Sequence, residues 1–464
     1  MKKIITGIIM ALVLSVSAAY AADGGAGKRI DINAALADPS QLAYSQGAVE
    51  LTKDGDGYGF PDAGEQVVSF GSQDINGFID CDMAFHFEGD QWAGFQFRAK
   101  DPTNRCWATT CYVVIVKSGN VEFQVFNSAG KTGYLANYNY TLPQDEKMNV
   151  KCGAIDTEQG TYLFLRLGDV MFGAMDADRS VAQAGYFNIG GSVGGITLYE
   201  TEASEDYQFP MVLAGYNPET GKAEAEVISV SNTETALEPV MSWYLSGPDF
   251  VYDPVTKTTE LADFQAIEGE TGTELLLAEQ EVGLYALCTA NIGDYTVYSN
   301  VAYIDPVEYV LENGFVGRIG YNRAIGKGNV FTYDETSISV YPDEIDDAVY
   351  MPYRGVMEGF NYPVTWDAET RTVSVKTPDA DAETVFSVDK KGFQSFKGLM
   401  GSAMNEEPKL IDDRTYLDLY TTSQILALDK VTYDAETGLI VLSKIDLELT
   451  ADQISDLAYT IEEM

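Results

Sequence analysis

The chain has 464 residues and a formal net charge of −42, from 71 acidic residues against 29 lysines and arginines. A surface this anionic repels phosphate backbones and anionic lipid, which excludes nucleic-acid binding and basic membrane docking as main functions. Hydrophobic residues make up 45% of the chain, so it can bury cores and is not a disordered acidic tail. The single histidine, His86, excludes sites that need two or three imidazoles, among them most copper and catalytic zinc sites.

Residues 1–21 have the pattern of a secretory signal peptide. Lys2 and Lys3 precede a mostly apolar stretch from Ile4 to Val16, and Ala19-Tyr20-Ala21 supplies small residues for cleavage. The stretch is shorter than the roughly 20 apolar residues that span a bilayer. We therefore expect a secreted protein, extracellular or at a bacterial cell surface, without a transmembrane segment.

Residues 22–205 are expected to form a β-sandwich. In 79–87, apolar residues at every second position alternate with Asp80, Asp82 and His86, and segments 94–98, 112–117, 121–126 and 162–167 repeat the pattern. Many short, evenly spaced strands are typical of an all-β sandwich. The strand Gly94-Phe95-Gln96-Phe97 and the final strand Ile196-Thr197-Leu198 resemble those that bracket the concanavalin A-like lectin/glucanase jelly roll. That resemblance implies a lectin-like, carbohydrate-binding head.

Residues 206–306 are expected to form a second, smaller sandwich. The segment from Glu281 to Cys288 approximates the D-x-G-x-Y-x-C corner of bacterial immunoglobulin-like domains, which this region resembles. Glu281 replaces the aspartate and Leu287 stands at the cysteine position, so the inter-sheet disulfide is absent. We expect Trp243 to pack on apolar residues instead.

Residues 307–446 contain an internal duplication. The segment from Ile345 to Met351 recurs from Ile411 to Leu417 at an offset of 66, and 365–370 recurs as 432–437 at an offset of 67. Each copy is expected to form a strand, a short helix (354–360 or 421–428) and a hairpin that turns on Asp-Ala-Glu-Thr. Met351-Pro352-Tyr353-Arg354 and the segment 366–373 resemble the copper amine oxidase N-terminal-like stalk domain, which implies an α+β stalk.

Two details of this region carry expectations of their own. The second copy has Asp418-Leu419-Tyr420 where the family's Pro-Leu-Arg helix entry would stand, so its helix entry has diverged. Trp366 is expected in the core, since the second copy places Tyr433 there. The resemblance does not imply copper, because in the amine oxidases the metal and the tyrosine-derived cofactor belong to the catalytic domain.

Residues 447–464 are expected to form a C-terminal helical tail. Thr450 and Gln453 make a capping-box pattern, and Ile454, Leu457, Ala458 and Ile461 share one helical face. We expect this helix to dock on the last domain, with partner binding as the alternative. The fold class is therefore mainly β and multidomain, with a jelly-roll β-sandwich, an Ig-like β-sandwich and a duplicated α+β stalk domain.

The candidate sugar-binding residues are Asn104, Arg105 and Trp107. They lie in a loop where an indole ring would stack on a sugar face while amide and guanidinium donors fix its hydroxyls. Trp107 as a surface platform and Trp107 as a core residue both remain open, whereas Trp92 is expected in the core.

Calcium is the one metal that the sequence suggests. Asp54, Asp56, Asp62 and Glu65 stand at positions 1, 3, 9 and 12 of a twelve-residue loop with glycine at position 6, as in calcium loops. Pro61 interrupts the loop and no helix is predicted beside it, so an acidic, glycine-rich surface turn is the alternative. No cofactor is expected beyond this structural calcium.

The cysteines suggest two disulfides in an exported chain. We expect Cys106 to pair with Cys111 across a local turn and Cys81 with Cys152 between strands, and four buried free thiols are the alternative.

No catalytic motif stands out. Glu88-Gly89-Asp90-Gln91-Trp92-Ala93 resembles the laminarinase pattern E-x-D-x-x-E but has alanine at the second glutamate, which leaves no acid to protonate the leaving group. The sequence therefore predicts an exported, non-catalytic protein that binds an extracellular glycan or cell-envelope component through its head, with the other domains as spacer and attachment. A glycoside hydrolase with carboxylates from distant strands, and a purely structural envelope protein, are the alternatives.

Overall fold

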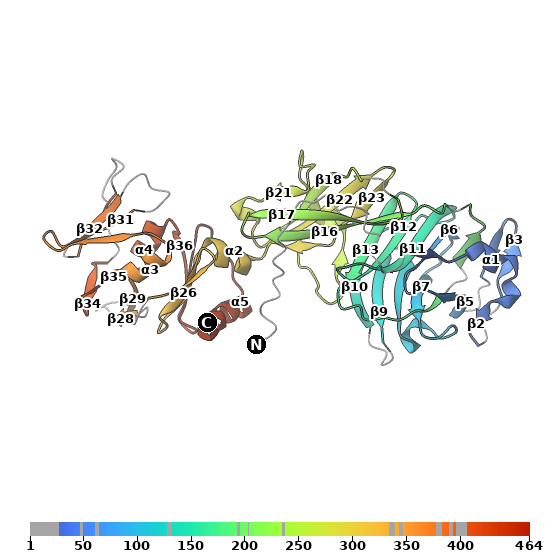
Figure 1. Ribbon diagram of the computed structural model, residues 1–464, viewed down its shortest axis with the longest axis horizontal. Coiled ribbons are helices and arrows are strands. Elements are labelled where there is room, and N and C mark those ends of the chain that lie inside the picture. The colour runs from blue at the N-terminus through green and yellow to red at the C-terminus, as the bar shows by residue number, and fades with distance from the viewer. Residues whose placement is uncertain are drawn as a thin grey trace. The chain divides into compact units, whose positions relative to one another are not determined.

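The computed structural model describes residues 27–46, 50–60, 65–127, 132–192, 195–202, 204–233, 237–333, 339–342, 347–376, 383–388, 393–395 and 406–464. The predicted signal peptide lies outside these residues. The chain divides into two compact units. Unit 1 contains Met1–Gly215, Glu224–Glu274 and Ala286–Ala302, and unit 2 contains Tyr216–Ala223, Leu275–Tyr285 and Tyr303–Met464. Strands are far commoner than helices in both units, which confirms the mainly β fold class (Figure 1).

Two long sheets build unit 1. Sheet A has the order β20-β18-β22-β23-β13-β12-β11-β6-β15-β4-β3, with β1 and β24 beside it, and sheet B has the order β19-β10-β9-β8-β7-β14-β5-β2. The strands of sheet A are β1 (Lys28–Arg29), β3 (Thr52–Asp54), β4 (Gly57–Gly59), β6 (Gly77–Phe85), β11 (Met148–Asp156), β12 (Thr161–Leu167), β13 (Val170–Asp176), β15 (Ile196–Tyr199), β18 (Val240–Ser246), β20 (Phe264–Ala266), β22 (Tyr285–Ile292), β23 (Tyr295–Tyr298) and β24 (Ala302–Tyr303). Those of sheet B are β2 (Ala43–Tyr44), β5 (Gln66–Gln73), β7 (Trp92–Ala99), β8 (Cys111–Lys117), β9 (Asn120–Phe126), β10 (Thr132–Asn139), β14 (Gly185–Gly191) and β19 (Thr258–Thr259).

The alternation in the sequence explains how these sheets pack. Successive side chains of a strand point to opposite faces, so the apolar half of each strand can be buried against the other sheet. Met83 of β6 and Phe95 and Phe97 of β7 are fully buried in one continuous core between the sheets. The two-sheet sandwich predicted for the head is therefore present. Short helices α1 (Ile32–Ala37), η1 (Pro39–Gln41), η2 (Cys106–Ala108), η4 (Leu261–Asp263) and η5 (Glu279–Glu281) lie between strands.

Both sheets of the predicted head continue into the predicted Ig-like region. Val170 of β13 pairs in parallel with Thr296 of β23 in sheet A, and Asn137 of β10 pairs in parallel with Thr258 of β19 in sheet B. The predicted boundary between 205 and 206 thus falls inside unit 1, and the domain limits stay a prediction. Trp243 is fully buried opposite Cys288, and its Nε1 donates to the carbonyl of Gly272 at 2.9 Å, so it packs as expected. Strands β16 (Gln208–Asn217), β17 (Lys222–Ser231) and β21 (Glu274–Leu276) form a separate sheet.

From Tyr303 onward, the described residues of unit 2 form three sheets and four α-helices. The sheet orders are β27-β26-β25-β37-β36, β28-β29-β35-β34 and β30-β31-β32-β33. Their strands are β25 (Phe315–Arg318), β26 (Arg323–Gly326), β27 (Asn329–Thr332), β28 (Ser339–Pro342), β29 (Asp347–Pro352), β30 (Val364–Asp367), β31 (Thr372–Lys376), β32 (Glu383–Ser387), β33 (Phe393–Ser395), β34 (Lys409–Ile411), β35 (Arg414–Asp418), β36 (Lys430–Asp434) and β37 (Leu439–Ser443). The helices are α2 (Pro306–Asn313), α3 (Tyr353–Gly359), α4 (Leu419–Leu426) and α5 (Ala451–Glu463).

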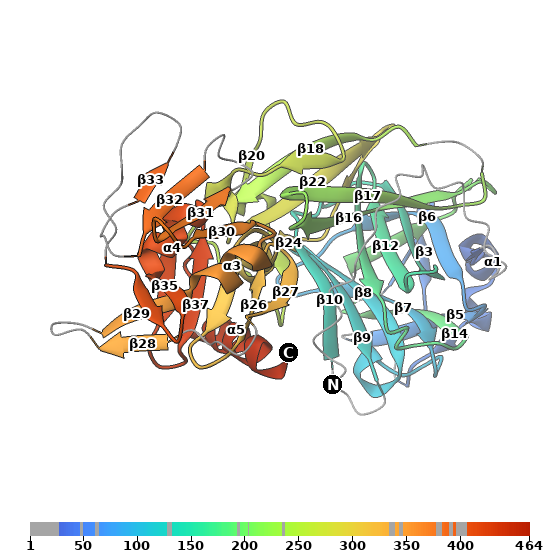
Figure 2. The ribbon, with the colours of Figure 1, turned by 60° about the vertical axis from the view of Figure 1, so that its left-hand side comes forward.

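The duplication is visible as a repeated order of elements. β29, α3 and the hairpin β30–β31 recur as β35, α4 and the hairpin β36–β37, and Figure 2 shows β29 and β35 side by side. The diverged entry of the second helix has a physical explanation. Pro352 begins α3 without a side-chain cap, whereas Asp418 caps α4 by accepting a hydrogen bond from the amide of Thr421 at 3.0 Å.

The C-terminal helix docks as expected. The amide of Gln453 donates to Thr450 Oγ1 at 3.3 Å and the amide of Thr450 donates to Gln453 Oε1 at 2.9 Å, which completes the capping box. Leu457 and Ile461 are buried in one cluster with Val441 of β37, so α5 covers a face of the five-stranded sheet of unit 2.

Candidate functional site

A row of polar side chains crosses the outer face of sheet B. Asn188 of β14 pairs with Gln96 of β7, Gln96 with Val113 of β8, and Val113 with Gln124 of β9. Directly opposed residues share a face, and their strand neighbours Phe95 and Phe97 fill the sandwich core, so this row faces away from the core. Asn188, Gln96 and Gln124 are nevertheless buried. The alternation in the sequence predicts the polar face of these strands but not that it is covered.

The adjacent row combines two glycines with a charged pair. Gly190 lies opposite Gly94, and further along the row lies the buried Glu122. A Cβ at Gly94 would lie 3.0 Å from the Trp92 ring, so the tryptophan occupies the space that a larger residue would fill. Glu122 forms an ion pair with Lys117 and accepts a hydrogen bond from Asn120 Nδ2 at 2.9 Å. The buried carboxylate is therefore paired, as a stable fold requires.

The connection between β7 and β8 folds over this face. Asp101 Oδ1 accepts hydrogen bonds from the amides of Thr103 at 2.8 Å and Asn104 at 3.0 Å, which shapes the loop. Asn188 Nδ2 donates to the carbonyl of Asp101 at 3.1 Å, so the polar row anchors the loop. Cys106 is buried against the apolar residues of the outer face. The loop is thereby held in place from both sides.

Two tryptophans meet at the edge of this loop. The ring centroids of Trp92 and Trp107 lie 6.1 Å apart, and Trp107 keeps 40% of its surface exposed. Arg105 Cζ lies 5.4 Å from the centroid of the Trp107 ring. Trp107 thus lies at the surface. Trp92, which we expected in the core, is half-buried and packs against the small apolar cluster of the outer face around Cys106, not between the two sheets. We call Trp92, Trp107, Arg105 and Asn104 the tryptophan surface; the buried Gln96 and Asn188 lie beneath its loop.

The sequence placed three candidate residues in this loop, and the structure separates their roles. Arg105 and Trp107 contact each other, whereas Asn104 is exposed in the same loop. Sequence reasoning missed Gln96 and Asn188, because polar residues on alternating strands usually face solvent. The two glycines that lie opposite each other, Gly94 and Gly190, were the sequence signal that could have indicated a site on this face.

Only part of the predicted calcium loop lies within the described residues. Asp62 and the side chain of Asp54 lie outside them, and Asp56 is exposed. Glu65 Oε2 lies 2.8 Å from Arg105 Nη1, so this carboxylate is paired with a guanidinium. Within the described residues no group of three or more histidine, cysteine, aspartate or glutamate side chains could hold a metal ion. Calcium binding at this loop stays a prediction.

The structure does not contain the disulfides that we expected. Cys81, Cys152, Cys106 and Cys111 are all free and buried, as is Cys288. Cys81 pairs with Val150 and Cys152 with Ile79, so the two thiols stand diagonally across β6 and β11. The Cα atoms of diagonal neighbours are about 7–8 Å apart, which exceeds the Cα separation of about 4.4–6.8 Å in a disulfide. Cys111 Sγ instead lies 4.0 Å from the carbonyl oxygen of Cys106.

His86 lies directly after β6 and is exposed. Its Nδ1 is 2.7 Å from Asp145 Oδ1, and its Nε2 is 3.3 Å from Thr197 Oγ1. A hydroxyl, an imidazole and a carboxylate in this order also occur in hydrolase triads. Here the carboxylate is largely exposed, and exposed ion pairs contribute little to stability, so these contacts serve as a surface link between β15, the end of β6 and the segment before β11.

Comparisons with known proteins identify one part of the chain. Residues 330–442 match the family model of the copper amine oxidase N-terminal domain. This match confirms the resemblance inferred from the duplicated segment. No curated protein matches the chain.

The solved structures that match include the carbohydrate-binding module CBM66 from Bacillus subtilis. It is 19% identical and covers 34% of this chain and 90% of that module, with a TM-score of 0.25. A TM-score this low gives no support for a shared binding site. A search of the described residues for a helix long and apolar enough to cross a membrane finds none.

Proposed function

We propose that this chain is an exported, non-catalytic protein that binds a neutral extracellular or cell-surface glycan at the tryptophan surface of unit 1. The observation that carries the proposal is the exposed ring of Trp107, held beside Trp92 and next to the exposed amide of Asn104 and guanidinium of Arg105. Apolar faces of sugar rings stack on aromatic side chains, and amide groups bind sugar hydroxyls.

The charges around this surface favour a neutral ligand. Arg105 is neutralised by Glu65 at 2.8 Å, and Lys117 by the buried Glu122. The chain as a whole carries a net charge of −42, so at this surface, where the arginine and the lysine are already paired, a polyanion meets net repulsion. An uncharged polysaccharide meets neither repulsion nor an unpaired buried charge.

The fixed loop favours binding without large rearrangement. Asp101 Oδ1 organises the loop from within, and Asn188 ties it to the sheet. A platform that is already ordered loses little conformational entropy when a ligand binds.

The rest of the chain would space and attach this head. The Ig-like region extends both sheets of unit 1, and unit 2 contains the copper amine oxidase N-terminal-like segment. The predicted signal peptide would export the protein, and the loop from Asp54 to Glu65 would bind a structural calcium ion.

The experiment uses the whole mature chain, residues 22–464, because both sheets cross the predicted head boundary. Binding to glucans, mannans, galactans, xylans and fructans is measured with and without a chelator, and each mixture is assayed for new reducing ends. We expect saturable binding to one neutral class without cleavage. Trp107→Ala should weaken that binding at least about tenfold, the factor that corresponds to ~1.4 kcal/mol.

Tyr433→Ala is the matched control, because Tyr433 is 39% exposed, close to the 40% of Trp107, and lies in unit 2. Equal losses in both variants would contradict the assignment to the tryptophan surface. New reducing ends would replace the proposal with the hydrolase alternative, and no binding to any glycan would favour a structural role. Loss of binding in chelator would add calcium to the site.

A further inference from the structure

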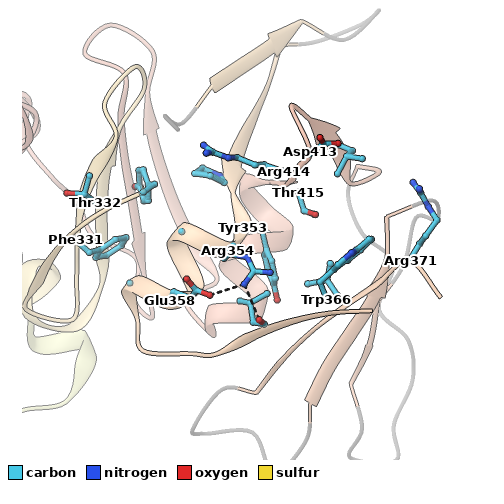
Figure 3. A pocket seen from close by; sticks show the side chains of 17 residues that line it. Phe331, Thr332, Tyr353, Arg354, Glu358, Trp366, Arg371, Asp413, Arg414 and Thr415 are labelled. Carbon is cyan, nitrogen blue, oxygen red and sulfur yellow. Dashed lines mark hydrogen bonds and ion pairs between the residues drawn. The ribbon is translucent and has the colours of Figure 1, made fainter. Parts of the chain in front are cut away.

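Unit 2 contains a pocket of about 660 Å³ that the proposed glycan surface does not involve. Figure 3 shows Phe331 and Thr332 on one side of it, Trp366 and Arg371 on another, and the side chains of Asp413 and Arg414 above α3. Pockets of about 300–1,000 Å³ commonly hold small organic ligands. The volume is therefore sufficient for a short oligosaccharide.

Both copies of the duplication build this pocket. The first copy supplies α3 with Arg354 and the hairpin β30–β31 with Trp366 and Arg371, and the second supplies the turn between β34 and β35. Asp412 and Asp413 in that turn have φ values of 51° and 62°. Positive φ at both central residues is typical of tight two-residue hairpin turns, whose backbone twist matches that of the flanking strands. This turn sets the position of Arg414, the first residue of β35. The pocket thus depends on the two copies folding together.

The lining of the pocket is cationic in a strongly acidic protein. Arg354, Arg371 and Arg414 contribute three positive charges, against the carboxylates of Glu358 and Asp413. The whole chain has 71 acidic residues and 29 lysines and arginines, so a local excess of cations is the reverse of its general composition. A local positive potential on an anionic protein selects for an anionic ligand.

Arg354 can exchange one of its two present partners for a ligand and keep the other, since Nη1 also donates to the carbonyl of Val364 at 3.3 Å. Its Nη1 lies 3.2 Å from Glu358 Oε1, one helical turn away, and both side chains are about half exposed. Exposed ion pairs of this kind contribute little to stability, so a ligand carboxylate can compete with Glu358 for the guanidinium. The planar guanidinium matches a carboxylate with two parallel hydrogen bonds.

Trp366 supplies an uncovered ring beside these charges. The side chain is 40% exposed, which contradicts our expectation that it belongs to the core. Thr365 and Asp367 beside it are exposed as well, so among the described residues none covers the end of β30. Tyr433, its equivalent in the second copy, is also exposed but does not line the pocket.

We propose that this pocket binds a carboxylate-bearing sugar, a uronic acid unit of an acidic glycan. The ring of Trp366 stacks on the sugar face, and Arg354 and Arg414 bind its carboxylate. The site is independent of the tryptophan surface, since it lies in the other unit and shares no residue with it. The chain therefore has two ligand sites of different charge preference.

The test is calorimetric titration of the whole mature chain with α-1,4-linked digalacturonate, with neutral galactobiose as the matched sugar. We expect saturable binding of digalacturonate, at least tenfold weaker binding of galactobiose, and weakening as NaCl is raised because partly exposed charges are screened. Arg414→Gln and Trp366→Ala should each weaken digalacturonate binding about tenfold or more. Both residues are exposed, so neither change removes a buried contact.

The controls separate this proposal from the first. Tyr433→Ala alters the equivalent position outside the pocket, Lys430→Gln removes an exposed cation elsewhere in unit 2, and both should bind digalacturonate as the parent does. Trp107→Ala should also leave digalacturonate binding unchanged, whatever its effect on neutral glycans. Equal binding of both disaccharides, no binding of digalacturonate, or undiminished binding by Trp366→Ala would overturn the proposal. Equally tight binding of acetate or inorganic phosphate would reduce the pocket to a general anion site and overturn the sugar assignment.

Discussion

Met351 and Leu417 lie directly opposite each other in the antiparallel ladder between β29 and β35. They are also equivalent positions of the duplication, because their numbers differ by 66, the offset of the repeated segment. In the flanking pairs, Tyr350 lies opposite Asp418 and Pro352 lies opposite Tyr416. Tyr350 is equivalent to Tyr416 and Pro352 to Asp418, so interchanging the two copies turns one flanking pair into the other. A pseudo-two-fold axis therefore passes through the pair Met351–Leu417, and the two copies share one core.

The hairpins of the two copies are completed by different strands. β31 pairs with β32, which follows the first copy, whereas β37 pairs with β25, which precedes it. Phe315 thus lies opposite Leu442, near the two ends of the duplicated region. β37 of the second copy pairs with β25, and β35 of the second copy pairs with β29 of the first. Because of these pairings, neither copy can be removed without opening a sheet that contains the other.

Alanine at either member of the axial pair should destabilise unit 2. Met351 and Leu417 are both fully buried, and truncation of such side chains costs about 2–5 kcal/mol. The double variant should cost less than the sum of the two single variants, because both remove the same contact. Urea unfolding monitored by circular dichroism measures this. Additive costs would show that the two residues are not coupled across the axis.

Arg98 should be the most sensitive charged residue of unit 1. Its side chain is fully buried; Nη2 lies 2.9 Å from Asp156 Oδ1, and Nε donates to the carbonyl of Ile75 at 2.7 Å. Arg98→Met would leave that carboxylate without its cation, which costs about 3–5 kcal/mol for a buried pair. Lys28→Met is the control, because its pair with Asp74 is exposed. Similar unfolding midpoints for the two variants would refute this role of Arg98.

The duplicated segment shows how much of the fold was readable from the sequence. Its helices and hairpins depend on local residues, such as the aspartates that begin each Asp-Ala-Glu-Thr turn, and local chemistry is present in the sequence. The exposure of Trp366 was not readable, since it depends on whether a distant segment covers β30. The same reason explains Gln96 and Asn188, whose strand pattern indicates a polar face but not the loop above it. The expected pairing of Cys81 with Cys152 failed because register across two strands 70 residues apart is a long-range property.

All five cysteines should be reduced and slow to react in the native protein. Burial raises the pKa of the Cys106 thiol to about 12 and that of Cys288 to about 12, so neither is a thiolate near neutral pH. Ellman's reagent should find few thiols in the folded protein and five after unfolding without reductant. Three reactive thiols after unfolding would indicate one disulfide, and a single one would restore both predicted pairs.

The pKa values of the aspartates in the two Asp-Ala-Glu-Thr turns should change by different amounts when the threonine of each turn is replaced. The Thr437 hydroxyl and amide, which donate to Asp434 Oδ2 at 2.6 Å and 2.7 Å, lower the pKa of Asp434, with the hydroxyl as the larger cause. For Asp367 the larger cause of the lowered pKa is the backbone amide of Thr370. Since each folded-state pKa is depressed, the stabilisation from these bonds is present above the unfolded pKa of the carboxyl and is lost as the pH falls through the folded pKa. Thr437→Val should therefore raise the pKa of Asp434 more than Thr370→Val raises that of Asp367, as carboxyl chemical shifts followed against pH by NMR would show. Equal shifts in the two variants would mean that the backbone amides dominate both turns.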